Sequence, residues 1–324
     1  MAHRVTHVPA DEAPWLSVIM PTYNGGAYLR AALESLRVQT ANGFEVIAVD
    51  DGSTDDTLRL LDEYSRILRL RVVRQQRSGN WVAGTNVGLS LAAGEYACFL
   101  HQDDLWLPGR AECVRRIVDT APEAALVVHP SWFVGENGER LGLWRCPLPA
   151  GKLESDLVLQ RLIVQNFLAI PAPVFRREVA LQAGGLDSTL WYTADWDLWL
   201  TLAERGVVVH EPEALAAFRV HDASQTSQRS RDGEGFRAQL EAVLRKHLRR
   251  ASARHDAIAS AAAFSVEVNV ALAQAMHGRR VAWGALLKRF FALGPAGWRR
   301  FLRDSRIIER VFARLRLRFR RRPT

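Results

Sequence analysis

An apolar run that ends in two adjacent aspartates constrains this chain more than any other feature. The run is VIAVDDGS at 46–53. Its composition is typical of a strand buried on both faces of a parallel sheet. Buried carboxylates need partners, so Asp50 and Asp51 should lie at the strand's carboxyl end, where open α/β sheets bind ligands. The layout recurs in YACFLHQDD at 96–104. Two acidic strand ends in one α/β unit predict a site for a polar ligand and a hard cation.

Apolar runs and helical spacings alternate along the first part of the chain. A capping-box-like pair, Ser53 and Asp56, is expected to begin a helix that ends near Tyr64. Residues 135–152, rich in Gly and Pro, predict a loop. This rhythm indicates right-handed βαβ units and a mostly parallel α/β sheet with flanking helices. Further strands are expected over 15–20, 70–73, 95–100 and 124–129, and further helices over 27–39, 83–93, 108–120, 174–183 and 195–203.

Formal charge divides the chain into two parts. From Phe236 onward there are 21 Lys and Arg against 5 Asp and Glu, a balance of +16, whereas residues 1–235 hold 22 against 30, a balance of −8. We therefore expect an α/β domain over 15–232 and a basic, amphipathic helical C-terminal region over 236–324. The segment 232–235, DGEG, is expected to link them.

We predict the cellular compartment from sequence features that are absent. Three cysteines without paired or metal-ligand spacing fit a reducing cytosol. The first residues have no apolar signal-peptide segment, and no stretch approaches the roughly 18 apolar residues of a membrane span. We expect a cytoplasmic protein that is soluble or peripheral on a membrane.

Several blocks, taken in order, resemble the family 2 glycosyltransferases, which have the GT-A fold. The resemblance spans roughly residues 15–228 and implies transfer of a sugar from a nucleotide-diphosphate sugar to an acceptor hydroxyl, with inversion at the anomeric carbon. The blocks are SVIMPTYN at 17–24, VDDGSTDD at 49–56, FLHQDD at 99–104, FRRE at 175–178, GGLD at 184–187, ADWDLWL at 194–200 and FRVH at 218–221.

The resemblance implies a donor site at the ends of the first two strands. The Tyr23 ring can stack on a nucleobase, or it simply packs. The family uses the position of Asp51 to bind uracil or a similar base, while Asp50 contacts the ribose or holds the turn. The residues that follow the first strand at this edge are Pro21, Thr22, Tyr23 and Asn24.

A divalent metal, Mn²⁺ or Mg²⁺, is the implied cofactor, since it neutralises a diphosphate leaving group. Asp103 matches the family's metal-binding aspartate. Asp104 is a second candidate ligand, or it caps the helix that follows. His101 stands where the family often has aspartate and is a possible ligand. Arg219 and His221 alternate along one strand face, and the family places such a pair near the donor. Arg219 is therefore expected at the diphosphate and His221 at the metal. The alternative is a surface pair.

Asp195 aligns with the family's catalytic base, which takes a proton from the acceptor hydroxyl; alternatively it only caps its helix. Ala194 replaces the Glu that the family often carries there, and Asp197 is expected to support structure or contact the acceptor. Together with His101, Ala194 leaves open a catalytically degenerate family member that acts as a nucleotide-sugar-binding or scaffold subunit. A nucleotidyltransferase would need a basic glycine-rich loop, and only Arg30 follows the first turn.

The basic tail carries an apolar stripe with arginines between its members. Such a pattern is typical of an amphipathic helix on an anionic membrane surface. The alternatives are packing on the catalytic domain or nucleic-acid binding, and the aromatic content argues against nucleic acid. A membrane position, on the inner face of the cytoplasmic membrane, fits a sugar or lipid-linked glycan acceptor and synthesis of bacterial cell-surface polysaccharide, lipopolysaccharide or glycolipid. The stripe consists of Trp298, Phe301, Leu302, Ile308, Phe312, Leu315 and Phe319.

Overall fold

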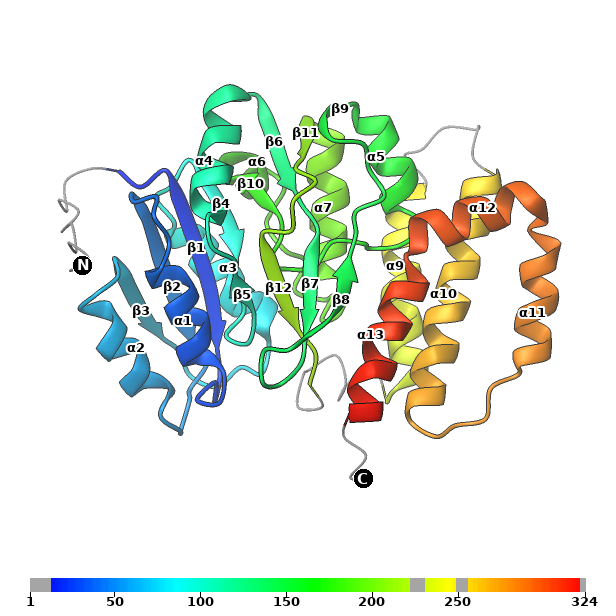
Figure 1. Ribbon diagram of the computed structural model, residues 1–324, viewed down its shortest axis with the longest axis horizontal. Helices are drawn as coiled ribbons and strands as arrows, with labels where there is room; N and C mark the ends of the chain where they lie inside the picture. The colour runs from blue at the N-terminus through cyan, green and yellow to red at the C-terminus, as the bar shows by residue number, and fades with distance from the viewer. Residues whose placement is uncertain (1–12, 222–230, 249–255, 321–324) are drawn as a thin grey trace.

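The computed structural model describes residues 13–221, 231–248 and 256–320. Its centre is an eight-stranded mixed sheet in the order β3-β2-β1-β4-β10-β6-β11-β9 (Figure 1). The first four of these strands are parallel, while β10 runs antiparallel to both of its neighbours. The strands are β1 (Leu16–Thr22), β2 (Phe44–Asp50), β3 (Leu70–Arg74), β4 (Tyr96–Phe99), β6 (Ala124–Val128), β9 (Gly151–Leu153), β10 (Val174–Arg176) and β11 (Val207–His210). The predicted α/β class with a mostly parallel sheet is confirmed.

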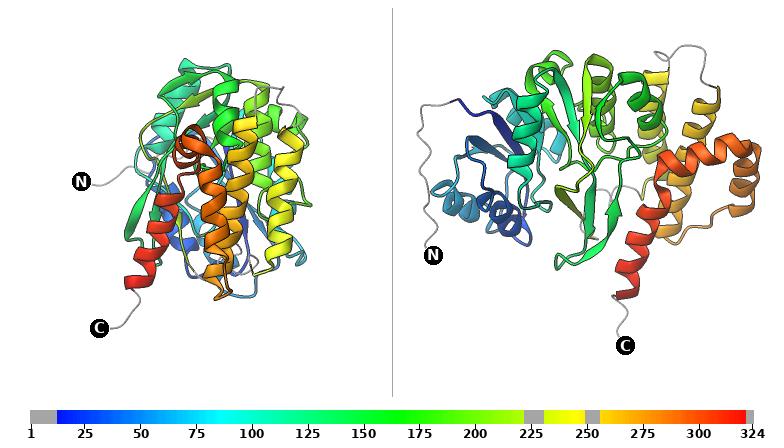
Figure 2. Two further views of the ribbon diagram at one scale, coloured as in Figure 1. Left: turned by 90° about the vertical axis from the view of Figure 1, so that its right-hand side faces the viewer. Right: turned by 45° about the horizontal axis from the view of Figure 1, so that its top comes forward.

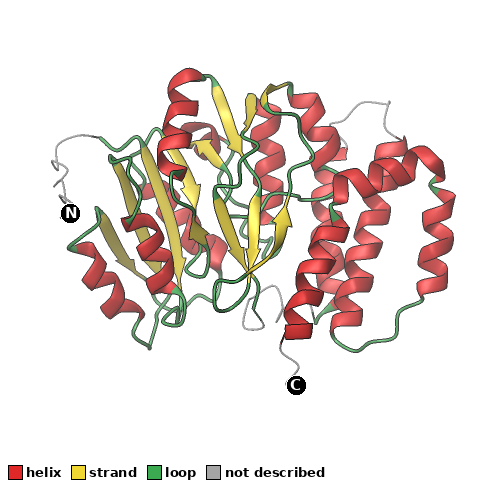
Figure 3. Ribbon diagram, viewed as in Figure 1, coloured by secondary structure: helices red, strands yellow, loops and turns green. Residues whose placement is uncertain are grey.

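Helices cover both faces of this sheet (Figure 3). Alternate residues of β1 serve two different cores: Ile19 packs with α3 and α7, whereas Val18 and Met20 pack with α1 and α2. This burial on both faces is the reason why the strands are almost continuously apolar. The helices are α1 (Leu29–Arg37), α2 (Thr57–Ser65), α3 (Trp81–Leu91), α4 (Arg110–Thr120), α5 (Ser155–Leu162), α6 (Arg177–Gln182) and α7 (Ala194–Arg205).

A second, four-stranded sheet stands beside the first, and it corrects two expectations. Its order is β5-β12-β7-β8, with β5 (Leu105–Trp106), β7 (Ser131–Val134), β8 (Arg140–Trp144) and β12 (Ala216–Arg219). The loop expected over 135–152 is therefore wrong in part, because it contains β8 and part of β9. Trp144 stabilises β8 by stacking on Phe133 at 4.9 Å between ring centroids. The helix expected over 174–183 begins as a strand, because Val174 and Phe175 are buried between β4 and β6.

The C-terminal region is a layer of helices at one end of the molecule (Figure 2). The linker expected over 232–235 is wrong for residues 233–235, which begin a helix directly after Asp232. Phe236, Leu240 and Ile258 join the same core as Trp199, so the region packs directly on the α/β unit. The helices are α9 (Gly233–Leu248), α10 (Asp256–Met276), α11 (Trp283–Ala292), α12 (Gly294–Ser305) and α13 (Ile307–Arg320).

One helix departs from the expectation that no segment is apolar and long enough to span a membrane. Among the described residues, α10 meets both criteria over its 21 residues, with a mean hydropathy of 1.3 in its most apolar window. However, 61% of that window is buried inside the protein. Its apolar character is thus accounted for by packing, since Ala261, Phe264 and Val270 contribute to the main core.

Candidate functional site

One cavity of about 530 Å³ gathers most of the predicted site residues at the carboxyl ends of β1, β2 and β4. Two predicted residues, Asp50 and Asp104, do not line it and are almost fully buried beside it. The predicted residues that line the cavity are Pro21, Thr22, Tyr23, Asn24, Asp51, His101, Asp103, Asp195, Arg219 and His221.

At one end of the cavity, Asp51 accepts several hydrogen bonds from the loop after β3. The donors are the Ser78 amide at 2.7 Å, the Ser78 hydroxyl at 2.8 Å, the Gly79 amide at 2.8 Å and the Arg77 guanidinium. Burial alone would raise the pKa of Asp51, but these hydrogen bonds outweigh it and lower the pKa below its usual value. The Arg77 guanidinium also lies 3.4 Å from the centroid of the Tyr23 ring. Arg77 was not predicted, although it follows a strand that ends at the same sheet edge.

Asp50 and Asn24 hold the two loops together. Asp50 accepts hydrogen bonds from the Thr22 hydroxyl at 3.1 Å and the Ser53 amide at 3.0 Å. Asn24, with φ of 44°, donates its backbone N–H to the Ser53 hydroxyl at 2.9 Å, and its side chain accepts from the Thr54 amide at 2.9 Å. Asp50 thus holds the turn, and its contact with the ribose stays a prediction. Ser53 is engaged here, so it does not cap α2 as expected.

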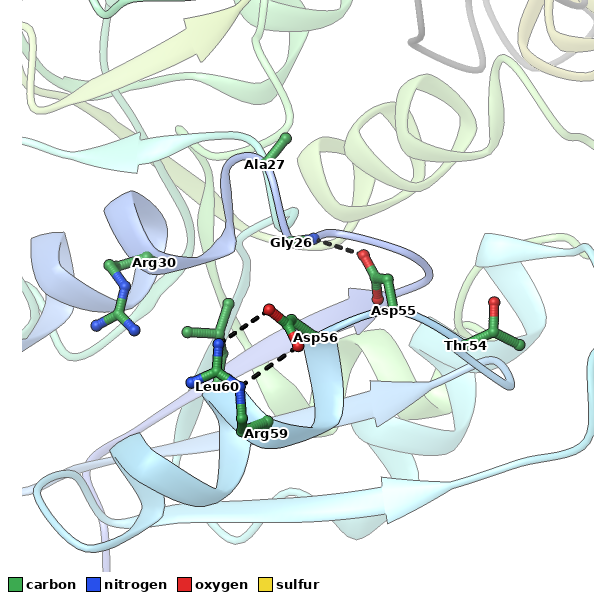
Figure 4. A pocket seen from close by; sticks show the side chains of 8 residues that line it. All are labelled: Gly26, Ala27, Arg30, Thr54, Asp55, Asp56, Arg59 and Leu60. Atoms are coloured by element: carbon green, nitrogen blue, oxygen red, sulfur yellow. Dashed lines mark hydrogen bonds and ion pairs between the residues drawn. The ribbon is translucent and has the colours of Figure 1, made fainter.

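A neighbouring recess of about 620 Å³ lies under the loop after β1 (Figure 4). Its polar groups are already paired: Asp55 accepts from the Gly26 amide at 3.0 Å, and Asp56 pairs with Arg59 at 2.9 Å. Arg30, also at its rim, pairs with Glu63. The side chains that line this recess therefore hold the loop in place, and the charged groups named here are already paired.

The acidic end of β4 forms a second cluster in the cavity. Ligand atoms of His101, Asp103 and Asp104 lie within 4.8 Å of one another. His221 Nε2 lies 2.8 Å from Asp103 Oδ2. Within the described part of the chain, His101 Nε2 and Asp104 Oδ2 are buried without a hydrogen-bond partner. Two orphaned buried atoms of this kind fit a cation held by carboxylate oxygen and imidazole nitrogen, a donor set that suits Mn²⁺.

The protonation of this cluster also fits a cation. Burial would raise the pKa of Asp103, but the hydrogen bond with His221 and the nearby His101 lower it. Burial lowers the pKa of His101, so its ring is neutral and its nitrogen lone pair is available. Burial and the charge of Asp103 raise the pKa of Asp104 well above its usual value. A bound cation would offset the repulsion between the two carboxylates.

Arg219 braces this cluster through backbone groups. Its side chain donates to the carbonyls of Asp103 at 2.8 Å, Gly135 at 2.7 Å and Glu136 at 2.9 Å. Its own amide donates to Asp104 Oδ1 at 2.9 Å. The structure therefore uses Arg219 to hold the loop after β4, and Asp104 is bonded to β12 rather than to the start of α4. Nucleotide-sugar binding by Arg219 stays a prediction.

Asp195 lies in the first turn of α7, in the part of the cavity that faces the C-terminal helices. Asn166 Nδ2 donates to Asp195 Oδ2 at 3.1 Å. Burial raises the pKa of Asp195 to about 6, in spite of the hydrogen bonds from the Trp196 backbone and Asn166. Asp197, on the other side of α7, is bonded to Lys246 at 2.7 Å and to His247 at 2.9 Å, so it anchors α9.

Residues from distant segments complete the cavity, and the sequence patterns did not indicate them. Two arginines of α13, Arg310 and Arg314, line the same space as Asp195. They are joined by Trp144 of β8 and by Tyr192 and Gln165 from loops. The packing of α13 along β8 brings the two arginines to the site (Figure 1).

Comparison with known proteins gives consistent results. The family model for glycosyl transferase family 2 matches residues 17–179. An uncharacterised glycosyltransferase of Rickettsia typhi is 28% identical over 239 residues, 72% of this chain and 73% of the relative. One of Haemophilus influenzae is 30% identical over 213 residues, 64% of this chain and 70% of the relative.

Two solved structures share the fold. Staphylococcus aureus TarS (residues 1–349) superposes with a TM-score of 0.60 at 19% identity, covering 92% of this chain and 91% of that one. The mannosyltransferase PcManGT of Pyrobaculum calidifontis, in complex with GDP-Man and Mn²⁺, gives a TM-score of 0.58 at 17% identity, covering 96% and 89%. TarS is also known in complex with UDP-GlcNAc.

Proposed function

The chain belongs to glycosyl transferase family 2, and from this we propose that it transfers a sugar from a nucleotide-diphosphate sugar to an acceptor hydroxyl, with inversion at the anomeric carbon. One observation carries the proposal. Asp195, with its raised pKa, shares a single cavity with Asp51 and with the cluster around Asp103. One space would thus hold the nucleoside, the diphosphate and the acceptor hydroxyl.

The nucleoside would bind at the Asp51 end. Its base would stack on Tyr23, and Asp51 would accept a hydrogen bond from a base N–H, as uracil and guanine both offer. Because the Arg77 guanidinium lies over the Tyr23 ring, it would have to move aside or share the ring with the base. UDP- and GDP-sugars are the donors to test first, since the structural neighbours are complexes with UDP-GlcNAc and GDP-Man.

Asp103, Asp104 and His101 would hold Mn²⁺ or Mg²⁺, with His221 either as a further ligand or as the group that orients Asp103. When bound, the cation supplies neutralisation of the negative charge on the diphosphate leaving group. Arg219 keeps the backbone of Asp103 in place through its hydrogen bond to the carbonyl.

Asp195 would act as the general base. The acceptor oxygen attacks the anomeric carbon, its proton passes to the Asp195 carboxylate, and the bond from that carbon to the diphosphate oxygen breaks. A pKa of about 6 keeps most of this carboxylate ionised at neutral pH while leaving it more basic than an ordinary aspartate. Asn166 orients it through Oδ2.

The test uses the purified protein with a panel of UDP-, GDP- and dTDP-sugars, with and without Mn²⁺. Thermal stabilisation by one nucleotide class identifies the donor. Release of free nucleotide should then fall by about a hundredfold or more in Asp195→Asn, in keeping with the loss of a general base, and stay unchanged in Asp62→Asn, an exposed aspartate. Donor binding without turnover would favour the degenerate binding or scaffold subunit suggested by His101 and Ala194. No nucleotide binding at all would refute both.

For localisation, we propose that the protein is cytoplasmic and peripheral on the inner face of the membrane, and that α11 contacts anionic lipid rather than nucleic acid. None of the ten residues of α11 is buried. Trp283, Leu287 and Phe291 recur along one side of it and are 52%, 56% and 58% exposed. Phe290, on another side, packs on Phe264 of α10. An exposed aromatic and aliphatic face in a strongly basic region suits a membrane surface. Such a position agrees with a sugar or lipid-linked glycan acceptor and a role in bacterial surface polysaccharide, lipopolysaccharide or glycolipid synthesis.

Sedimentation with phosphatidylglycerol vesicles tests this placement. The double variant Leu287→Ser, Phe291→Ser should lose most vesicle binding. Leu181→Ser, which removes an exposed leucine of α6, is the matched control and should bind like the parent protein. Equal sedimentation of the double variant and the control would argue against α11 as the membrane contact.

A further inference from the structure

Two arginines of α13 form one wall of the cavity. Arg310 and Arg314 are one helical turn apart, and both line the same space as Asp195. Arg310 is 7% exposed, and Arg314 is half-buried. On the same side of the helix, Ala313 and Leu317 pack against Phe133 of the second sheet. This packing holds the two guanidinium groups at the cavity.

The positive charge of this pair is not neutralised by the described residues around it. Arg310 donates to the Asn269 side chain at 3.1 Å, while its Nη1 is buried without a partner. Among the residues that the structure describes, Arg314 donates only to the carbonyl of Arg310, at 3.2 Å. Burial and the charge of Arg310 lower the pKa of Arg314 to about 10.

Two nearby arginines differ from this pair, because a carboxylate neutralises their charge. Arg306, which directly precedes α13, and Arg145, which directly follows β8, both pair with Glu309. A buried and a half-buried guanidinium group without such a carboxylate are costly unless a ligand supplies the negative charge. This wall therefore has the character of an anion site.

We propose that Arg310 and Arg314 bind a phosphate or diphosphate group of the acceptor. The inference rests on the proposed sugar transfer and adds the chemical class of the acceptor to it. A carboxylate would bring one negative charge to two guanidinium groups, whereas a phosphate monoester or a diphosphate brings about two. Guanidinium groups also match phosphate oxygens with paired hydrogen bonds.

The hydrogen bonds around the pair connect it to the acceptor side of the cavity. Asn269, the partner of Arg310, donates to Gln165 at 2.6 Å. Gln165 in turn donates to the carbonyl of Asn166 at 3.4 Å, and Asn166 holds Asp195. The nucleoside end has its own guanidinium in Arg77. The arginine pair therefore belongs with the general base, not with the donor's base-binding groups.

Calorimetric titration with inorganic phosphate and pyrophosphate, in EDTA to exclude the metal-dependent donor site, tests the pair directly. Removing one charge-assisted contact in Arg314→Gln should weaken binding roughly ten- to hundredfold. Arg314→Lys, which keeps the charge but loses the fork of donors, should lie between. Arg316→Gln is the matched control, because Arg316 is on the same helix, does not line the cavity and donates to the Leu141 carbonyl. Equal affinities for Arg314→Gln and Arg316→Gln, with both folded by circular dichroism, would overturn the inference.

Two further titrations separate the outcomes. Binding of UDP or GDP with Mn²⁺ should be the same in Arg314→Gln and the parent. Loss of nucleotide binding in the variant would assign the pair to the donor and overturn the inference, whereas absence of nucleotide binding in the parent would refute the proposed function alone. Titration with monomeric dihexanoyl phosphatidic acid distinguishes the source of the phosphate group. Tighter binding than inorganic phosphate assigns the phosphate group to a lipid, and equal binding assigns it to a soluble phosphate. Either result supports the site.

Discussion

Asp197 should contribute more to stability than any exposed aspartate, because it joins the α/β unit to the C-terminal helices. Its side chain is 4% exposed and bonded to His247, which is 2% exposed, and to Lys246, which is 40% exposed. Breaking a buried ion pair costs about 3–5 kcal/mol, and the exposed Lys246 can regain water, so the lower end, about 3 kcal/mol, is expected for Asp197→Asn. For a chain of 324 residues this corresponds to a fall in Tm of about 4 °C.

The effect should depend on pH in a defined window. Burial opposes the charge of Asp197, but its bonds to His247 and Lys246 lower its pKa, so its contribution is present above the unfolded value of about 3.9 and is lost in acid. Burial likewise disfavours charged His247, but the bonds to Asp197 and Glu204 raise its pKa, so its contribution is complete below about 6.5 and is lost as pH rises through the raised value. The Tm difference should be largest between about pH 4 and 6.5.

Differential scanning fluorimetry from acidic to alkaline buffers measures this difference. Asp62→Asn is the matched control, since Asp62 and Arg66 form an exposed pair at 66% and 76% exposure, for which less than about 1 kcal/mol is expected. A fall in Tm of less than about 1 °C for Asp197→Asn, or a fall that is the same at every pH, would refute the reasoning.

Three further outcomes are expected. The rate of sugar transfer should rise with pH through about 6 and then level off as Asp195 ionises; a profile that is flat through this range would exclude it as the base. Gly88→Ala should lower the urea midpoint, by about 1–3 kcal/mol in stability, because the new Cβ would lie 2.5 Å from Ile19 Cγ2, whereas Gly84→Ala in the same helix meets only an ordinary contact at 3.7 Å and should be neutral or stabilising. His101→Ala should raise the Mn²⁺ concentration needed for half-maximal activity roughly tenfold or more; an unchanged Mn²⁺ dependence would remove His101 from the metal site.

The parts of the fold that could be predicted are those in which the local spacing of apolar residues indicates which residues are buried. β1, β2 and β4 are largely apolar because each is covered on both faces. β10 was missed because its three residues form a strand only by pairing with β4 on one side and β6 on the other. β8 was missed because its stability comes from the stacking of Trp144 on Phe133, a contact between segments that are glycine-rich in sequence.

In the site, too, sequence motifs indicate local features but not the contacts between distant segments. The motifs located the acidic strand ends, since the carboxyl ends of parallel strands meet at one edge. They did not indicate what those acids contact. Asp51 accepts a hydrogen bond from Arg77, which lies in a loop without a recognised motif. The Arg219 side chain donates to backbone carbonyls, including that of Asp103 in the loop after β4. Arg310 could not be found from spacing, because its place depends on how α13 docks.

The apolar stripe of the tail illustrates why periodicity alone left two alternatives open. The stripe was expected on a membrane or packed on the catalytic domain, and the Phe319 side chain lies outside the described residues. Arg306, with φ of 49°, breaks the stripe between α12 and α13. Before the break Phe301 is buried at 4% exposure, whereas after it Ile308 and Phe312 are 55% and 57% exposed.

Past that break α13 reverses the usual arrangement of a surface helix in a globular protein, in which the apolar side faces the core and the charged side faces water. In α13 the side that carries Arg310 and Arg314 faces the cavity, while the opposite apolar side, with Phe312, is exposed. One helix thus presents positive charge to the site and apolar surface to the outside. This arrangement fits the proposed acceptor, because its phosphate would enter the cavity while a lipid attached to it would lie along the exposed apolar side.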